Sequence, residues 1–150
     1  MIHEHSIALT DFARQVARLI ARAGGAALFI DYGRDEPGYG DTLQALRRHE
    51  KEHPLSNPGE ADLTAHVDFP AFAAAAEAQG GATGPIRRQG EFLRSLGVET
   101  RAAELARARP DRADVIARQL ERLIGPDHMG ILFKAVCLHS PGLAPPGFEP

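Results

Sequence analysis

A continuous apolar run at residues 26–30 is the feature that most constrains what this chain can fold into. Before it, apolar residues recur at helical spacing over residues 12–23, and two glycines follow where a helix ends in a left-handed residue. A short apolar strand directly after a helix is typical of a parallel sheet covered on both faces. The run ends in a polar triplet, residues 31–33, and ligands of such sheets bind at the carboxyl ends of strands. The sequence therefore predicts an α/β fold with a candidate site at this strand end.

The other predicted elements are too few to complete such a sheet. Only two strands are well defined, at residues 26–30 and 129–139, whereas a sheet usually has about four to six. We therefore expect residues 1–140 to be the C-terminal part of a larger domain, incomplete without upstream strands. Residues 141–150 read as a proline-rich tail that is extended or frayed. The remaining expected elements are a helix at Thr42–Glu52 stopped by Pro54, a helix at Phe69–Gly80 capped by Asp68, a strand at Gly81–Ile86, and helices at Gln89–Leu96 and Asp111–Ile124.

Composition narrows the class of protein. With 43% hydrophobic and 25% charged residues over 150 positions, the chain resembles an ordinary globular domain rather than a disordered one. A net charge of -3 gives no reason to expect a nucleic-acid-binding surface. No apolar stretch approaches the ~20 residues of a membrane span, and the first five residues do not resemble a signal peptide. Cys137 is the only cysteine and cannot form an intrachain disulfide, so we expect a cytoplasmic protein.

The end of the first strand carries Asp31 and Tyr32. A carboxylate at this position can accept hydrogen bonds from a cationic or amide group of a substrate, and a phenol can donate one. The alternative is that Asp31 caps only neighbouring backbone amides. We predict a catalytic role for Asp31 and a substrate-binding role for Tyr32.

His66 and Asp68 form a second candidate pair. If their segment is extended, both side chains point to the same side, and Asp68 can orient the imidazole of His66 for recognition or proton transfer. Asp68 is equally a helix cap, and the two roles can coexist; we predict that both residues are catalytic. Further polar side chains predicted to bind substrate are Asp41, Thr42, Gln44 and Gln89. The first three can equally hold their loop in place.

Residues 49–53, His-Glu-Lys-Glu-His, match the H-E-x-x-H pattern of zinc proteases. On a helix, the two imidazoles would share one face. However, charged side chains surround the motif and Pro54 stops the helix, so we interpret the segment as an exposed charged helix and predict no metal site. Gly38-Tyr39-Gly40 has neither a strand before it nor a suitable helix after it, and turn chemistry explains it better than a phosphate site.

Five sequence words, in this order, carry a resemblance to a known family: ALFIDYG, GDTLQA, PLxxPGxADLTAHVDF, QGEFLxxLG and MGxLFK. Together they resemble the MidA-like family of class I S-adenosylmethionine-dependent methyltransferases, over about residues 7–148. The family's mitochondrial member is a complex I assembly factor and protein arginine methyltransferase. The resemblance implies a Rossmann-like seven-stranded sheet in which residues 26–30 form the fifth strand and the last strand runs antiparallel.

The resemblance also implies S-adenosyl-L-methionine as cofactor and a protein substrate, with a respiratory complex I subunit as the candidate. The family's glycine-rich cofactor loop lies upstream and has no counterpart in these 150 residues, so no cofactor-binding residue is assigned. What matches is the half of the domain that shapes the acceptor side. Two functions therefore remain open: a fragment of a protein arginine N-methyltransferase, or a non-catalytic lobe that binds proteins. An unpaired sheet edge in such a lobe would favour self-association.

Overall fold

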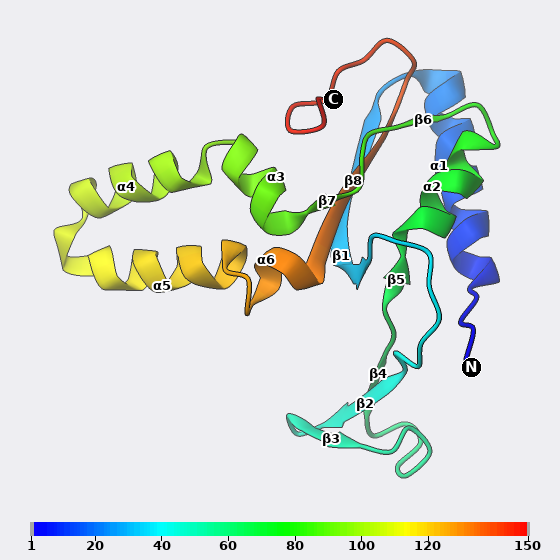
Figure 1. Ribbon diagram of the computed structural model, residues 1–150, viewed down its shortest axis with the longest axis horizontal. Helices are drawn as coiled ribbons and strands as arrows, with labels where there is room; N and C mark the ends of the chain where they lie inside the picture. The colour runs from blue at the N-terminus through cyan, green and yellow to red at the C-terminus, as the bar shows by residue number, and fades with distance from the viewer. Residues whose placement is uncertain (1, 150) are drawn as a thin grey trace.

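Two long strands, β1 (Ala26–Arg34) and β8 (Phe133–His139), form the centre of the main sheet in the computed structural model, which describes residues 2–149 (Figure 1). They pair antiparallel from Ala26 opposite His139 to Tyr32 opposite Phe133. The short strands β6 (Ala82–Thr83) and β7 (Arg87–Arg88) pair antiparallel with β8 as well. β5 (Val67–Asp68) runs parallel to the last two residues of β1. The predicted α/β class and the antiparallel last strand are confirmed.

Helices α1 (Ile7–Ala23) and α2 (Phe69–Glu77) cover one face of this sheet (Figure 1). The Ser6 hydroxyl accepts a hydrogen bond from the Leu9 amide and starts α1, which ends at Gly24 with a left-handed φ of 74°. As predicted, Asp68 caps α2. Alanine, branched aliphatic and aromatic side chains fill the interface between the helices and the sheet: Ala13, Ala17, Ile20, Phe69, Phe72, Val136 and Leu138.

The opposite face is covered by α3 (Gln89–Ser95) and by the C-terminal tail. Phe148 is 6% exposed, and its ring lies 4.9 Å from that of Phe92. The expectation of a frayed tail is therefore wrong at this residue, because one aromatic side chain anchors it to the core. Cys137 is buried in the same cluster, where burial raises the pKa of its thiol.

A helical arm projects from the body of the molecule (Figure 1). It consists of α4 (Val98–Ala108), the short 3₁₀ helix η1 (Pro110–Arg112) and α5 (Ala113–Ile124). The sequence predicted α5 but not α4. The single turn α6 (Met129–Leu132) follows where the sequence predicted a strand, because Gly130 packs against the Ile124 carbonyl. None of the helices within residues 2–149 is both long and apolar enough to cross a membrane.

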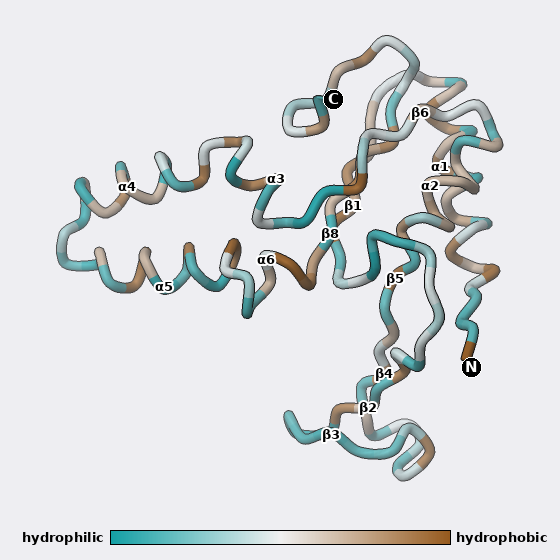
Figure 2. The backbone as a smooth tube through the Cα atoms, viewed as in Figure 1, coloured by the Kyte–Doolittle hydropathy of each residue, from teal (hydrophilic) through white to brown (hydrophobic). Residues whose placement is uncertain are grey.

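A second, three-stranded sheet lies below the first in Figure 1 and is built from β2 (Gln44–Arg47), β3 (Glu50–Glu52) and β4 (Asp62–Thr64). The predicted helix at Thr42–Glu52 is therefore wrong. Arg48 and His49 both have positive φ, 54° and 68°, which closes a two-residue hairpin whose twist suits the strands. The hairpin tip is hydrophilic (Figure 2). The H-E-x-x-H pattern thus lies on a hairpin, and within residues 2–149 no group of three potential metal ligands comes together.

Candidate functional site

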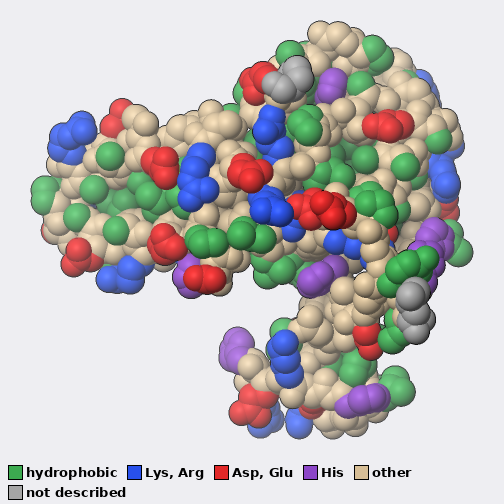
Figure 3. Space-filling model, in the orientation of Figure 1, with side chains coloured by type: hydrophobic (Ala, Val, Ile, Leu, Met, Phe, Trp, Pro, Cys, Tyr) green, Lys and Arg blue, Asp and Glu red, His purple; other side chains and the backbone are tan. Residues whose placement is uncertain are grey.

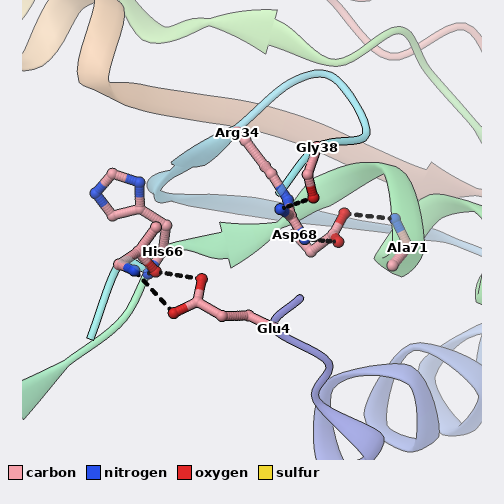
Figure 4. A network of polar contacts seen from close by, with 7 residues as sticks. Glu4, Arg34, Gly38, His66, Asp68 and Ala71 are labelled. Atoms are coloured by element: carbon pink, nitrogen blue, oxygen red, sulfur yellow. Dashed lines mark hydrogen bonds and ion pairs between the residues drawn. The ribbon is translucent and has the colours of Figure 1, made fainter. Parts of the chain in front are cut away.

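The carboxyl end of β1 is the meeting point of three segments: the residues before α1, the loop after β1, and β5 (Figure 4). Between them lies a crevice of about 300 Å³. We call it the polar crevice, and the charged and polar side chains that line it are Glu4, His5, Ser6, Arg34, His66 and Asp68. Of the predicted site residues, His66 and Asp68 line this crevice, whereas Asp31 and Tyr32 do not.

Asp68 uses both of its carboxylate oxygens within the polar crevice. Its Oδ1 accepts a hydrogen bond of 3.0 Å from the Ala71 amide, and its Oδ2 forms an ion pair with the Arg34 guanidinium. Arg34 also donates to the Gly38 carbonyl at 2.6 Å and so ties the loop after β1 to the start of α2. Both charged side chains are largely shielded, with exposed fractions of 19% for Arg34 and 24% for Asp68. Asp68 therefore acts as cap and ion-pair partner at once.

His66 does not receive the orienting contact that we predicted. Both carboxylate oxygens of Asp68 are taken up by Arg34 and Ala71, and the imidazole points away from Asp68 (Figure 4). The predicted His66–Asp68 pair is thus corrected, because a stronger guanidinium partner occupies the carboxylate. Instead, the His66 ring lies 6.0 Å from the Tyr32 ring in an edge-to-face arrangement. The structure therefore brings His66 together with Tyr32.

The N-terminal segment forms a wall of the crevice that the sequence did not reveal. The Glu4 carboxylate accepts hydrogen bonds from the Thr42 amide at 2.8 Å and the Thr42 hydroxyl at 2.7 Å. The same hydroxyl accepts from the His66 amide at 2.9 Å. Burial raises the pKa of Glu4, but the hydrogen bonds from Thr42 and Leu43 outweigh this, so the pKa lies below its ordinary value. Thr42 is therefore a structural link, the role that we weighed against substrate binding.

Asp31 lies on a neighbouring wall. It is exposed, and its Oδ1 accepts a hydrogen bond of 2.8 Å from the amide of Tyr32, the local capping that we considered as the alternative. Together with Phe12, Phe29, Val67 and other apolar residues, it lines an apolar cavity of about 170 Å³. Leu9 lines this apolar cavity and the polar crevice, so the two spaces adjoin.

The other predicted substrate-binding residues are not gathered at the crevice. Asp41 is exposed on the loop after β1, and Gln44 begins β2. Gln89 is only 4% exposed, and its amide donates to the Leu123 carbonyl at 2.8 Å. Its predicted role is corrected, because that amide holds α3 against the end of α5 rather than facing an opening.

Lys134 is a buried cation that sequence reasoning missed. It lies opposite Asp31 in the sheet, is 5% exposed, and donates through Nζ to the Gly33 carbonyl at 2.9 Å and the Ile131 carbonyl at 2.7 Å. Burial lowers its pKa. A lysine within the apolar run Phe133–His139 was the available signal, because a charge inside a buried strand must find partners. Lys134 therefore fastens the carboxyl end of β1 to the start of β8.

Two solved structures from Burkholderia thailandensis share this fold. One belongs to an uncharacterized protein; it matches with a TM-score of 0.81 and 29% sequence identity, covering 97% of this chain and 39% of its own. The second belongs to a protein of the same superfamily and contains bound S-adenosyl-homocysteine. It matches with a TM-score of 0.76 and 30% identity, covering 95% of this chain and 37% of its own.

Named relatives are found in animals. The Drosophila melanogaster protein arginine methyltransferase NDUFAF7 homolog is 38% identical over 141 residues, which is 90% of this chain and 31% of the relative. Human NDUFAF7 is 33% identical over 126 residues, 83% of this chain and 28% of the relative. Both names describe mitochondrial proteins, as does that of the rat relative. The cytoplasmic location that we predicted contradicts this finding and is wrong.

In each comparison, this chain matches less than half of a longer protein. This chain spans 31% of the fly relative and 28% of the human relative, so it corresponds to a part of a longer protein in both comparisons. A family model described as "Putative S-adenosyl-L-methionine-dependent methyltransferase" matches residues 2–86, more than half of the chain. The resemblance inferred from the five sequence words is confirmed. The chain belongs to the S-adenosyl-L-methionine-dependent methyltransferase family.

Proposed function

We propose that this chain supplies the acceptor side of a protein arginine methyltransferase. The observation that carries the proposal is the polar crevice at the carboxyl end of β1, which His66 lines and beside which Tyr32 lies. The names of the relatives support an arginine acceptor. Methyl transfer to nitrogen depends mainly on in-line placement of the acceptor and on a group that accepts or holds its proton.

The side chains around the crevice have chemistry that suits a guanidinium. A carboxylate binds a guanidinium through charge-assisted hydrogen bonds, and the Arg34–Asp68 pair in the crevice is an internal example. Asp68 is already paired with Arg34, so it has little capacity left for an incoming arginine. Asp31 has more capacity, because within residues 2–149 its side chain accepts a hydrogen bond from the amide of Tyr32 and forms no ion pair. Tyr32 and His66 add a phenol and an imidazole that can hold the acceptor by hydrogen bonds.

The residues of this chain do not fit the cofactor by themselves. In α/β folds, nucleotide-containing cofactors are typically bound where a strand leads through a glycine-rich turn into the N-terminus of a helix. Here β1 leads through residues 35–43 into the strand β2, and β8 leads into the proline-containing tail. The strands β5 and β7 lead directly into α2 and α3, with no glycine-rich turn between strand and helix. We therefore assign S-adenosyl-L-methionine binding to a part of the domain outside these 150 residues.

The experiment joins residues 1–150 to the preceding part of a relative and measures transfer of labelled methyl groups to arginine-containing proteins. We expect Asp31→Asn to lower the transfer rate at least tenfold while binding of S-adenosyl-homocysteine is unchanged. Asp62→Asn, on exposed β4, is the matched control and should leave the rate unchanged. Transfer at the original rate by the Asp31→Asn variant would refute the assigned role of Asp31.

For the acceptor, we propose an arginine of a respiratory complex I subunit. The support is the family resemblance together with the mitochondrial names of the relatives. Incubating the same fused enzyme with isolated complex I subunits, followed by mass spectrometry of the products, tests this choice. Methylarginine only in proteins outside complex I would contradict it.

A second candidate function is a protein-binding lobe, and one specific observation favours it. Within the described residues, β1 pairs on the side away from β8 only at Gly33 and Arg34, so its edge from Ala26 to Tyr32 is open. Leu28 and Ile30 on this stretch are 50% and 41% exposed. Such an edge pairs readily with another strand, including that of a second copy.

Sedimentation of the isolated chain tests the second function. We expect concentration-dependent association, which Ile30→Lys should abolish, because an edge lysine opposes strand pairing. Leu63→Lys on β4 is the control, because Leu63 is also an exposed strand residue, at 59% compared with 41% for Ile30. A monomer at all concentrations would argue against use of the edge.

A further inference from the structure

The helical arm carries an apolar groove that the proposed methyl-transfer site does not use. The groove has a volume of about 350 Å³ and runs between α4 and α5. Its apolar lining residues are Val98, Ala102, Leu105, Val115, Ile116, Leu120 and Leu123. Figure 2 shows hydrophobic and hydrophilic residues alternating along both helices, and Figure 3 shows hydrophobic side chains along the middle of the arm.

The packing of the arm leaves this groove without a partner among the described residues. No residue of α4 is buried, and in α5 only Ile124 is, at the end that meets the body. Leu105 and Leu123 are 39% and 37% exposed. Amphipathic helices in a globular protein normally bury such a stripe. An exposed apolar surface of this kind marks an interaction site.

The charges around the groove decide between occupants. Arg101, Arg109 and Arg112 line it, and no acidic residue does. Arg101 pairs with Glu104 and Arg109 with Asp111, whereas among the described residues Arg112 forms no ion pair. Two copies joined through the same groove would enclose both Arg112 side chains with no acidic lining residue to meet them, because a two-fold interface uses the same patch of each copy. A partner with acidic side chains beside an apolar stripe would instead meet Arg112 with complementary charge.

The dimensions of the groove indicate the form of the partner. Val115 to Leu123 spans nine residues of α5, and the eight steps between them cover about 12 Å at the rise of an α-helix. Apolar anchors at positions i, i+4 and i+7 of a helix span about 10 Å, which fits that length. We propose that the arm binds an acidic amphipathic helix of a partner protein in this groove, independently of the methyl-transfer chemistry.

Binding of two synthetic helices to the full 150-residue chain tests the proposal. The probes are labelled 18-residue peptides with leucines at i, i+4, i+7 and i+11, flanked by glutamates in one peptide and by lysines in the other. We expect fluorescence anisotropy to show at least tenfold tighter binding of the glutamate peptide. Leu105→Glu should weaken that binding at least tenfold.

Charge reversal supplies the matched pair of variants. Arg112→Glu should weaken binding of the glutamate peptide about tenfold and improve binding of the lysine peptide. Arg118→Glu, on the same helix but outside the groove, should change neither. Circular dichroism establishes that each variant is folded.

Three outcomes would overturn the proposal. Equal affinity for the two peptides would show that the groove does not select an acidic partner, and binding of neither would show that it does not accept a free helix. Dimerisation of the unmodified chain that Leu105→Glu abolishes and Ile30→Lys leaves intact would assign the groove to a second copy.

Discussion

The neighbouring strands β1 and β8 are both apolar, yet they are buried to very different degrees. Five successive residues of β8, Lys134–Leu138, are buried, whereas in β1 only Gly33 is. β8 lies between β1 on one edge and β6 and β7 on the other, with packed clusters on both faces. β1 has an open edge along most of its length. Burial of these two strands therefore follows from their neighbouring strands and from the packing on their faces, and not from hydrophobicity alone.

The largest expected effect is the difference in stability between matched leucine substitutions in β8 and β1. Leu138 is 1% exposed, so Leu138→Ala should lower the free energy of unfolding by about 2–5 kcal/mol, since it leaves a cavity in the core. Leu28 is 50% exposed, and Leu28→Ala should cost about 1 kcal/mol or less. Urea unfolding followed by circular dichroism measures both. Equal reductions would mean that another chain covers β1 in solution, and the contrast between the strands would not hold.

A substitution of Lys134 measures how much the hydrogen bond between β8 and the end of β1 contributes to stability. Lys134→Met removes the donor to the Gly33, Ile131 and Leu132 carbonyls. It should lower the free energy of unfolding by about 2 kcal/mol, because the buried Gly33 carbonyl is left without this partner. The chain has one other lysine, Lys51, which is exposed on β3. Lys51→Met should change stability by about 0.5 kcal/mol or less in the same assay. A Lys134→Met protein as stable as the parent would show that these hydrogen bonds contribute nothing.

These two strands also show what sequence reasoning can reach. The apolar runs of β1 and β8 and the cap at Asp68 were predicted because each leaves a local signal: an uninterrupted run, or a capping residue before a helix. The hairpin at Arg48-His49 was missed because its positive-φ residues are not the glycine or asparagine that usually marks such a turn.

The candidate site was predictable only in part, for a related reason. Position along β1 and β5 located Tyr32, His66 and Asp68 near one strand end. Which partner each side chain would take depended on residues distant in sequence. Arg34 reaches Asp68 across 34 positions, and Glu4 reaches Thr42 across 38. Pattern and spacing carry no information about such pairings, and for this reason the ion pair that Asp68 forms in place of the predicted His66 interaction could not be foreseen.

Two substitutions of Asp68 separate the contribution of helix capping from that of the ion pair with Arg34. Asp68→Ala removes both and should lower the free energy of unfolding by about 1–2 kcal/mol. Asp68→Asn keeps a good cap and removes the charge, so the reduction should be about half as large or less. Denaturant unfolding of the two variants measures the difference. If both variants are destabilised equally, the ion pair with Arg34 carries the stabilisation, and capping contributes nothing.

The smallest expected effect concerns the N-terminal wall of the polar crevice. The pKa of Glu4 lies below its ordinary value of 4.5, because the hydrogen bonds from Thr42 favour the ionised carboxylate more than burial opposes it. A lowered pKa stabilises the folded state fully above pH 4.5, and this contribution is lost as the pH falls through the folded-state pKa. The Thr42 amide donates to Glu4, so its nuclear magnetic resonance shift should titrate with a midpoint below 4.5. In the Glu4→Gln variant, this titration should vanish, while the amide shifts of the β8 residues should be the same as in the parent. A midpoint at or above 4.5 would mean that the N-terminal segment is not held at the crevice, and this wall of the site would then have to be removed from the proposal.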